Sequence, residues 1–187
     1  MPTNRCESHF ELFGLPQSFE VNLAKLDRIY RDLQRSVHPD RFTNASEQER
    51  RISIQQAARI NDAYAILKDP LSRGRYLLEL HGHEFNDENS TTRNTEFLVE
   101  QMELREVLAD VRDSDDPMGA LNALMDRITD RLKESTQRLS ACLDQDETGQ
   151  LTGPIDGAVD TVLKMKFYRR LQEDMLDLEA ELDNDLA

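Results

Sequence analysis

Apolar side chains recur every three or four residues along most of this 187-residue chain, which is the spacing of one face of an α-helix. The first long stretch of this kind begins after Asn22, a residue type that caps helices, and runs to about residue 36. A second long helix is predicted to begin at the capping box formed by Ser46 and Glu49. No segment alternates with a period of two residues, so the pattern predicts helices and no strands.

The two long helices flank a short loop and carry matching apolar stripes, so we expect them to pack against each other as an antiparallel pair. The stripes are Leu26, Ile29, Tyr30, Leu33 and Val37 on the first helix, and Ala57, Ile60, Ala63, Tyr64 and Leu67 on the second. A short apolar element at 9–13 precedes the pair. Asp69 and Pro70, an N-cap followed by an N1 proline, predict a shorter helix that ends near residue 80.

The second half of the chain predicts three further helices, over about 93–112, from the cap at Asp116-Pro117 to about 142, and over about 155–182. Their apolar positions are Phe97, Leu104, Leu108 and Val111; Leu121, Met125, Ile128, Leu132, Leu139 and Cys142; and Val159, Leu163, Phe167, Leu171, Met175, Leu178 and Leu182. Three amphipathic helices with short connections predict a left-handed bundle. The chain is therefore interpreted as a domain at 1–80, a polar linker at 81–92 and a domain at 93–187.

Charge divides unevenly between these halves. Residues 1–76 contain 12 Lys and Arg against 10 Asp and Glu, whereas residues 77–187 contain 11 against 27. So acidic a half does not bind nucleic acid by releasing counterions, and it favours partners with basic surfaces. No apolar run approaches the roughly 20 residues needed to cross a bilayer, and the N-terminal residues lack a signal-peptide core. We expect a cytoplasmic protein that binds neither membrane nor nucleic acid.

Residues suited to metal or catalytic chemistry are sparse. The two cysteines, Cys6 and Cys142, lie far apart and outside any Cys-x-x-Cys motif, which argues against a disulfide framework and a thiolate zinc site. His81 and His83 stand near three acidic residues (Glu79, Glu84 and Asp87) but lack the i, i+4 spacing of a helical metal pair. No glycine-rich phosphate loop or nucleophile motif is present. We therefore expect no metal, no cofactor and no enzymatic activity.

The most informative motif is His38-Pro39-Asp40, which lies between the two long N-terminal helices. Proline disfavours the α region for the residue before it, so the first helix must end at His38 and the tripeptide must form a rigid loop. The positions of this helix that lie off the apolar stripe are cationic: Lys25, Arg28, Arg31 and Arg35. A basic helix that ends in His-Pro-Asp resembles the J-domain, the module that docks onto DnaK-type ATPase chaperones.

Longer segments extend the resemblance beyond the His-Pro-Asp motif. Residues 58–67 (ARINDAYAIL) resemble the third-helix consensus of J-domains, and Arg73 and Tyr76 match a basic and a tyrosine position of that family. Residues 75–82 (RYLLELHG) and 97–106 (FLVEQMELRE) are similar to the HscB family, the J-type co-chaperones of iron–sulfur cluster assembly. The likeness covers about residues 8–182. Arg41 stands where lysine is common, and the Cys-x-x-Cys pair of some eukaryotic members is absent, which implies a bacterial-type protein without zinc.

Resemblance to J-domains implies that His38, Pro39, Asp40 and the four cations of the preceding helix engage the chaperone's ATPase domain and stimulate ATP hydrolysis. Asp40 can accept a charge-assisted hydrogen bond from a partner arginine, and a basic helix can meet an acidic patch. His38 is a contact residue in this interpretation and not a general base. The alternative is an ordinary turn in which Asp40 caps a backbone group.

Resemblance to HscB implies a second binding surface on the first helix of the C-terminal domain. If the apolar stripe faces the bundle, an exposed flank carries three apolar residues bordered by three acids. The HscB positions implicated in binding IscU, the scaffold on which clusters are built, match Leu98, Val99, Met102, Glu103, Glu106, Asp110 and Phe167. Valine at 99 and aspartate at 110 depart from the common residues, so contacts there are expected to be weaker. The alternatives are that the apolar residues widen the core stripe and that Phe167 is a core aromatic.

The expected protein is all-α and L-shaped, with an N-terminal J-domain (an antiparallel helical hairpin with short flanking helices) and a C-terminal three-helix bundle. Its expected function is to bind and stimulate a DnaK-type chaperone, HscA, and to deliver IscU to it. Two alternatives remain at this point. One is a J-protein for a different client, and the other is an acidic helical adaptor that is not a chaperone.

Overall fold

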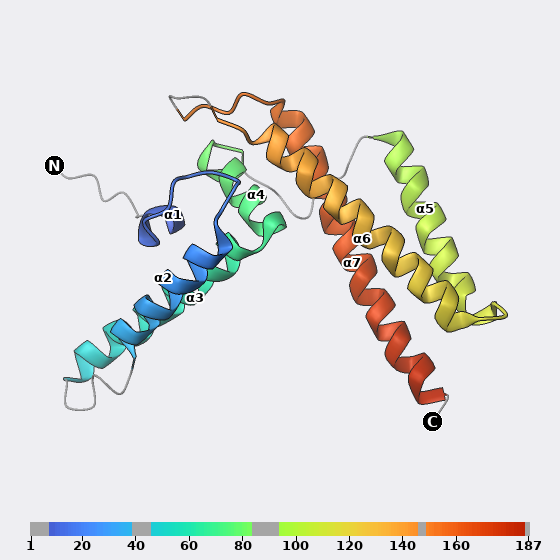
Figure 1. Ribbon diagram of the computed structural model, residues 1–187, viewed down its shortest axis with the longest axis horizontal. Helices are drawn as coiled ribbons and strands as arrows, with labels where there is room; N and C mark the ends of the chain where they lie inside the picture. Colours follow the sequence, from blue (N-terminus) through green and yellow to red (C-terminus); the bar gives the residue numbers. More distant parts are fainter. Residues whose placement is uncertain (1–7, 39–45, 84–93, 146–148, 186–187) are drawn as a thin grey trace. The chain divides into compact units, whose positions relative to one another are not determined.

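The computed structural model describes residues 8–38, 46–83, 94–145 and 149–185, and the chain divides into two compact units, Met1–His81 and Gly82–Ala187. The secondary-structure elements of the described residues are helices joined by loops (Figure 1), and β-type pairing among these residues is confined to an isolated bridge between Gln145 and Leu151. The all-α expectation is therefore confirmed. None of the described helices is both long and apolar enough to cross a bilayer. Residues 84–92 of the predicted linker lie outside the described residues.

The first unit consists of α1 (His9–Leu12), α2 (Leu23–Val37), α3 (Glu47–Lys68) and α4 (Pro70–Leu80). All three caps expected in this unit are present. The Asn22 side chain accepts a hydrogen bond from the Lys25 amide, Ser46 and Glu49 form a reciprocal capping box, and the Asp69 side chain accepts from the Ser72 amide. Because each cap satisfies helix-end donors through a side chain three residues away or fewer, these boundaries were readable from the sequence.

The core of the first unit lies between α2 and α3, which run side by side as a hairpin (Figure 1). Leu26, Ile60 and Leu67 are buried there, and Phe10 of α1 is buried as well. The guanidinium of the buried Arg73 lies 4.9 Å from the centre of the Phe19 ring, and its Nη1 donates to the Leu67 carbonyl oxygen at 2.6 Å. Arg73 therefore ties α4 to the end of α3 and to the segment before α2.

The second unit consists of α5 (Thr95–Asp110), the 3₁₀ turn η2 (Val111–Asp113), α6 (Pro117–Cys142) and α7 (Ile155–Asp185). Asp116 caps α6 as expected, and Asn94, which the sequence analysis did not assign, caps α5 by accepting from the Phe97 amide. α6 and α7 pack together along their length and α5 contacts both. The predicted three-helix bundle is confirmed, with a buried core of Phe97, Leu104, Val111, Leu121, Leu124, Ile128, Tyr168, Leu171, Met175 and Leu178.

The apolar stripe predicted for α7 is wrong in its first half. Val159 and Leu163 are only partly buried, whereas the fully buried apolar residues of that half are Ala158, Val162, Met165 and Tyr168. The predicted stripe advanced four residues at a time from Val159, and four residues turn an α-helix by more than one full turn. The error accumulates with each step, so the stripe winds around the helix unless steps of three residues alternate with steps of four.

The turn between α6 and α7 is tightly packed. Cys142, the last residue of α6, is buried as expected for a small apolar position. A β-carbon at Gly153 would lie 2.5 Å from the Cys142 carbonyl oxygen and 2.6 Å from its Cα. The Thr152 amide donates to the Asp144 carbonyl oxygen at 2.9 Å. Main-chain contacts therefore hold together the segment that follows α6 and the segment that precedes α7.

Candidate partner-binding surfaces

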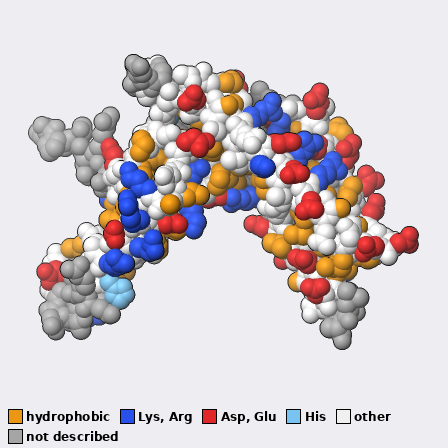
Figure 2. Space-filling view, viewed as in Figure 1, with side chains coloured by type: hydrophobic (Ala, Val, Ile, Leu, Met, Phe, Trp, Pro, Cys, Tyr) orange, Lys and Arg blue, Asp and Glu red, His pale blue; other side chains and the backbone are white. Residues whose placement is uncertain are grey.

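The outer face of α2 is cationic. Leu26 is fully buried against α3, and the four predicted cations, Lys25, Arg28, Arg31 and Arg35, are all exposed. The space-filling view shows Lys and Arg side chains gathered along the first unit (Figure 2). The amphipathic pattern of this helix thus places apolar side chains inward and leaves four positive charges accessible to a partner.

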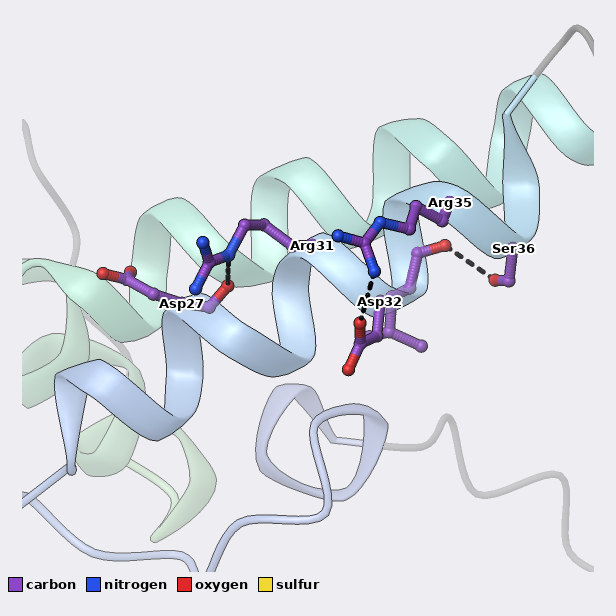
Figure 3. Close-up of polar contacts among 6 residues, drawn as sticks. Asp27, Arg31, Asp32, Arg35 and Ser36 are labelled. Carbon is purple, nitrogen blue, oxygen red and sulfur yellow. Dashed lines mark hydrogen bonds and ion pairs between the residues drawn. The ribbon is translucent and has the colours of Figure 1, made fainter.

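Contacts of the arginines on α2 are local and weak (Figure 3). Arg31 Nε donates to the main-chain oxygen of Asp27 at 3.3 Å, and Arg35 Nη1 lies 3.3 Å from Asp32 Oδ1. The side chains of Arg35 and Asp32 are 78% and 64% exposed, and such surface pairs contribute about 0–1 kcal/mol. These contacts hold the guanidinium groups close to the helix without removing them from solvent.

One acidic residue of α2 is engaged by α3. The Tyr64 hydroxyl donates to Asp27 Oδ1 at 2.7 Å, and the Tyr64 ring stacks on Tyr30 with centroids 3.9 Å apart. Lys68 Nζ donates to the Tyr64 hydroxyl at 2.9 Å, and this hydrogen bond raises the pKa of Lys68. The Asp27 carboxylate therefore interacts with the partner helix, which leaves the outer face of α2 dominated by its cations.

His38 lies at the C-terminal end of α2 with an exposed side chain. Its extended backbone, with φ of −60° and ψ of 133°, is the conformation that a following proline favours. Pro39 and Asp40 lie outside the described residues. The structure thus ends α2 at the predicted residue and presents its imidazole to solvent.

Ser53, which was not predicted from the sequence, anchors this end of α2. The Ser53 hydroxyl donates to the Val37 carbonyl oxygen at 2.8 Å, and Ser53 is only 2% exposed. Val37 is also buried, so the hydrogen bond satisfies one of the carbonyl groups that a helix end leaves without a partner. The available signal was the spacing of Ser53 from Ala57 and Ile60, which puts a hydroxyl on the inward face of α3.

The predicted flank of α5 is exposed. Leu98, Val99 and Met102 are 38%, 50% and 73% exposed, whereas Phe97 and Leu104 on the opposite face are buried. The alternative that the three apolar residues widen the core stripe is therefore wrong. Apolar side chains left in water on one side of a helix indicate a surface for association.

Carboxylates border this apolar surface. Glu103, Glu106 and Asp110 are all exposed on the same flank. Val107, which the sequence analysis did not single out, is 43% exposed and lies beside them. We call Leu98, Val99, Met102 and Val107 the α5 strip. The α5 strip with its three acids combines an apolar centre with a charged rim.

Phe167 of α7 contacts both the core and α5. Its ring meets Phe97 edge-on with centroids 5.7 Å apart, and the Arg105 guanidinium lies 5.4 Å from its centre. Phe167 is partly buried and packs against the core of the second unit. It therefore has a structural role in holding α7 against α5 and also retains some accessible surface.

Comparison with known proteins gives a consistent result over nearly the whole chain. Residues 93–175 match the family model described as the HSCB C-terminal oligomerisation domain. The co-chaperone protein HscB homolog of Vibrio atlanticus is 43% identical over 175 residues, which cover 94% of this chain and 98% of that protein. The chain belongs to the HscB family of co-chaperones.

Solved HscB structures share the fold. Chaperone HscB from Vibrio cholerae superposes with a TM-score of 0.80 at 41% identity, covering 94% of this chain and 99% of that one. Human co-chaperone HscB gives a TM-score of 0.82 at 32% identity, covering 95% and 84%. This HscB protein is thus a J-type co-chaperone of iron–sulfur cluster assembly, with a J-domain and a C-terminal helical bundle. The alternative of an adaptor that is not a chaperone is set aside.

The histidines near the end of α4 form no metal cluster in this HscB protein, as far as the described residues extend. His81 Nδ1 lies 2.8 Å from the Leu77 carbonyl oxygen, so its ring is engaged by the helix itself. Among the described residues no group of three His, Cys, Asp or Glu side chains could hold a metal ion. Glu84 and Asp87 lie outside the part of the chain that the structure describes.

Proposed function

We propose that this HscB protein binds an HscA-type chaperone through α2 and the His38-Pro39-Asp40 loop, stimulates its ATPase, and delivers to it an IscU-type scaffold bound on α5. The protein acts in the cytoplasm in this proposal. It contributes contacts and no catalytic group, metal or cofactor of its own.

The chaperone contact is supported by the exposed cations of α2 and by the exposed imidazole at its end. Positive side chains on a rigid helix steer an acidic partner surface into register. Ser53 holds the Val37 carbonyl group, so His38 leaves the helix from a fixed position. Asp40 supplies a charge-assisted acceptor for a chaperone arginine in this proposal.

The scaffold contact rests on the observation that carries the proposal: three apolar side chains lie in solvent on the face of α5 opposite its core residues. Apolar anchors at the centre of an interface provide most of its affinity, and charged rims contribute orientation and specificity. Glu103, Glu106 and Asp110 favour a basic border on the scaffold. Phe167 adds the accessible edge of an aromatic ring from α7.

Delivery follows from binding both partners with one chain. When the chaperone and the scaffold are bound to separate units of the same protein, their encounter becomes intramolecular. The effective concentration of the scaffold at the chaperone then reaches the millimolar range typical of short linkers, about 10⁻³ M. The proposal therefore requires no new chemistry from the co-chaperone.

The scaffold surface is tested by calorimetry with a double variant, Val99→Ala/Met102→Ala. Removing methyl and thioether groups from an interface centre costs about 1–3 kcal/mol, so scaffold affinity should fall about tenfold or more. Leu176→Ala, which truncates a side chain of α7 that is 53% exposed, is the matched control and should bind the scaffold normally. Unchanged affinity of the double variant would remove α5 from the proposal.

The chaperone surface is tested separately with His38→Gln. This variant should retain its helical circular dichroism, because His38 is exposed, and should no longer stimulate the chaperone's ATPase. Its scaffold affinity should equal that of the wild type. Normal stimulation by His38→Gln would exclude His38 from the chaperone contact and leave that contact to the cations of α2.

A further inference from the structure

A polar cavity lies in the second unit, apart from the α5 strip. Its volume is about 300 Å³, and it is lined by residues from α5, α6 and α7. The α6 residues are spaced at i, i+3, i+4 and i+7 and the α7 residues at i, i+3 and i+7, so each helix contributes one face. This volume is at the lower end of the range of small-molecule sites, about 300–1,000 Å³.

Both carboxylates of the cavity are engaged by one arginine. Arg131 Nε lies 3.0 Å from Glu100 Oε1, and Arg131 Nη1 lies 3.2 Å from Glu134 Oε2. The nearby Glu100 charge is the main cause of the raised pKa of Arg131. These three residues therefore form a compact network that joins α5 to α6, and its two carboxylates exceed its single guanidinium by one negative charge.

The other polar residues of the cavity are mainly donors. Arg138 is exposed, and no ion pair joins it to a carboxylate within the described part of the chain. Lys164 Nζ lies 3.0 Å from Asp160, which engages one of its three protons. The Ser135 hydroxyl also lines the cavity.

Tyr168 and Thr161 are the two buried residues of the cavity lining. The Thr161 hydroxyl donates to the Gly157 carbonyl oxygen at 2.7 Å, so it can only accept a further hydrogen bond. Burial, followed by the Glu100 charge, raises the pKa of Tyr168, so its phenol is neutral at physiological pH. Thr161 and Tyr168 therefore contribute buried, uncharged polar groups to the cavity.

The charge of the cavity contrasts with that of its surroundings. Residues 77–187 contain 27 acidic and 11 basic residues, and three of those 11 line this one cavity. The lining residues carry three cations against two carboxylates, an excess of one positive charge. A site where arginine, lysine and hydroxyl groups converge with this excess is suited to a negatively charged group with several acceptor oxygens.

We propose that this cavity binds a small oxyanion, a phosphate or carboxylate group, through Arg138, Lys164 and Ser135. The planar guanidinium of Arg138 matches two oxygens of such a group, and the Lys164 ammonium supplies a second charge from the facing helix. The site is independent of the surfaces assigned to the chaperone and the scaffold.

The test is a titration of the full-length protein followed by NMR of the arginine Nε–Hε and backbone amide signals. Inorganic phosphate, succinate and chloride are added at constant ionic strength. Saturable shifts of Arg138 Nε–Hε and of amides near Ser135 and Lys164 with phosphate, with succinate or with both support the proposal and identify the preferred group. Non-saturating shifts that chloride reproduces overturn it.

Arg138→Gln provides the decisive variant, because Arg138 is exposed on α6 and its replacement should leave the fold intact. Loss of a charge-assisted contact should weaken anion binding about tenfold. Arg127→Gln, an exposed arginine of the same helix that does not line the cavity, is the matched control and should bind like the wild type. Equal affinity of wild type and Arg138→Gln also overturns the proposal.

Discussion

The two units present binding surfaces of opposite chemistry on a similar scaffold of amphipathic helices. In the first unit the solvent face of α2 carries four cations, and the apolar residues are turned toward α3. In the second unit α5 leaves apolar residues in solvent and surrounds them with acids. Coulombic attraction across water is screened by salt, whereas apolar burial is not, so the two surfaces should respond to different perturbations.

Charge reversal on α2 should separate the surfaces most strongly. Arg31→Glu/Arg35→Glu replaces two exposed positive charges with negative ones, and the apparent affinity for the chaperone should fall on the order of tenfold to hundredfold. Scaffold affinity should not change. Arg127→Glu/Lys133→Glu, on the exposed face of α6, makes the same change in net charge and serves as the control. Equal losses in both double variants would mean that net charge, and not the α2 surface, determines docking.

Ionic strength should affect binding at the α2 surface more than binding at the α5 strip, and this difference can be measured without any substitution. Raising salt from about 0.1 M to about 1 M shortens the Debye length from about 10 Å to about 3 Å. Stimulation of the chaperone at a subsaturating concentration of this protein should drop about tenfold, and scaffold affinity measured by calorimetry should change by less than about twofold. A parallel decline of both would contradict the assignment of the α5 strip as an apolar anchor.

Removing the hydroxyl that anchors the end of α2 should have a smaller effect. Ser53→Ala leaves the buried Val37 carbonyl group without its partner, so the free energy of unfolding should decrease by about 1–3 kcal/mol. ATPase stimulation should decline because His38 is less firmly positioned, and scaffold affinity should stay constant. Ser36→Ala is the control, since Ser36 also donates to a carbonyl oxygen, that of Leu33, but in solvent. Similar unfolding midpoints for the two variants would exclude this role for Ser53.

The smallest predicted effect is a pH dependence confined to the first unit. Burial lowers the pKa of His9, whose ring stacks on Tyr76 with centroids 4.4 Å apart. The folded state therefore binds a proton less readily than the unfolded state. The burial of neutral His9 therefore contributes fully to stability above the pKa of His9 in the unfolded chain, about 6.5. This contribution is lost as the pH falls through that value toward the lower pKa of His9 in the folded state.

His9→Phe keeps an aromatic ring against Tyr76 and removes the titration. Urea unfolding of the wild type should therefore weaken more than that of His9→Phe between about pH 8 and about pH 5. Ellipticity of the whole protein and tyrosine fluorescence can report this difference, because Tyr76 stacks on residue 9. Identical pH profiles for the two proteins would show that the His9 proton is not linked to folding.

Features that depend on neighbouring residues in sequence were predictable. The caps at Asn22, Ser46 and Asp69 involve side chains and amides three residues apart, so the sequence contains both partners. The exposed flank of α5 also followed from a single helix, because Phe97 and Leu104 define the inward direction over only two turns. The same method failed on the first half of α7, where successive steps of four residues, each more than one full turn, carried the predicted stripe away from the buried face.

Features that depend on how two helices meet were not predictable. The Ser53 hydroxyl reaches Val37, the Tyr64 hydroxyl reaches Asp27, and the Arg105 guanidinium covers the Phe167 ring, each across a helix–helix contact. Single-helix periodicity fixes which face points inward and leaves the axial register between helices open. The cavity around Arg131 was not predictable for the same reason, because three helices contribute its residues.

The contact between Gly153 and Cys142 bears on how freely this protein can vary. Gly14, Gly82 and Gly149 have positive φ angles, yet nothing lies within 4 Å of a β-carbon placed on any of them. Gly153 does not have a positive φ angle, but a methyl group there would collide with the main chain of Cys142. In a saturation-mutagenesis library, position 153 should consequently accept few replacements, because the main chain of Cys142 leaves no room for a side chain there.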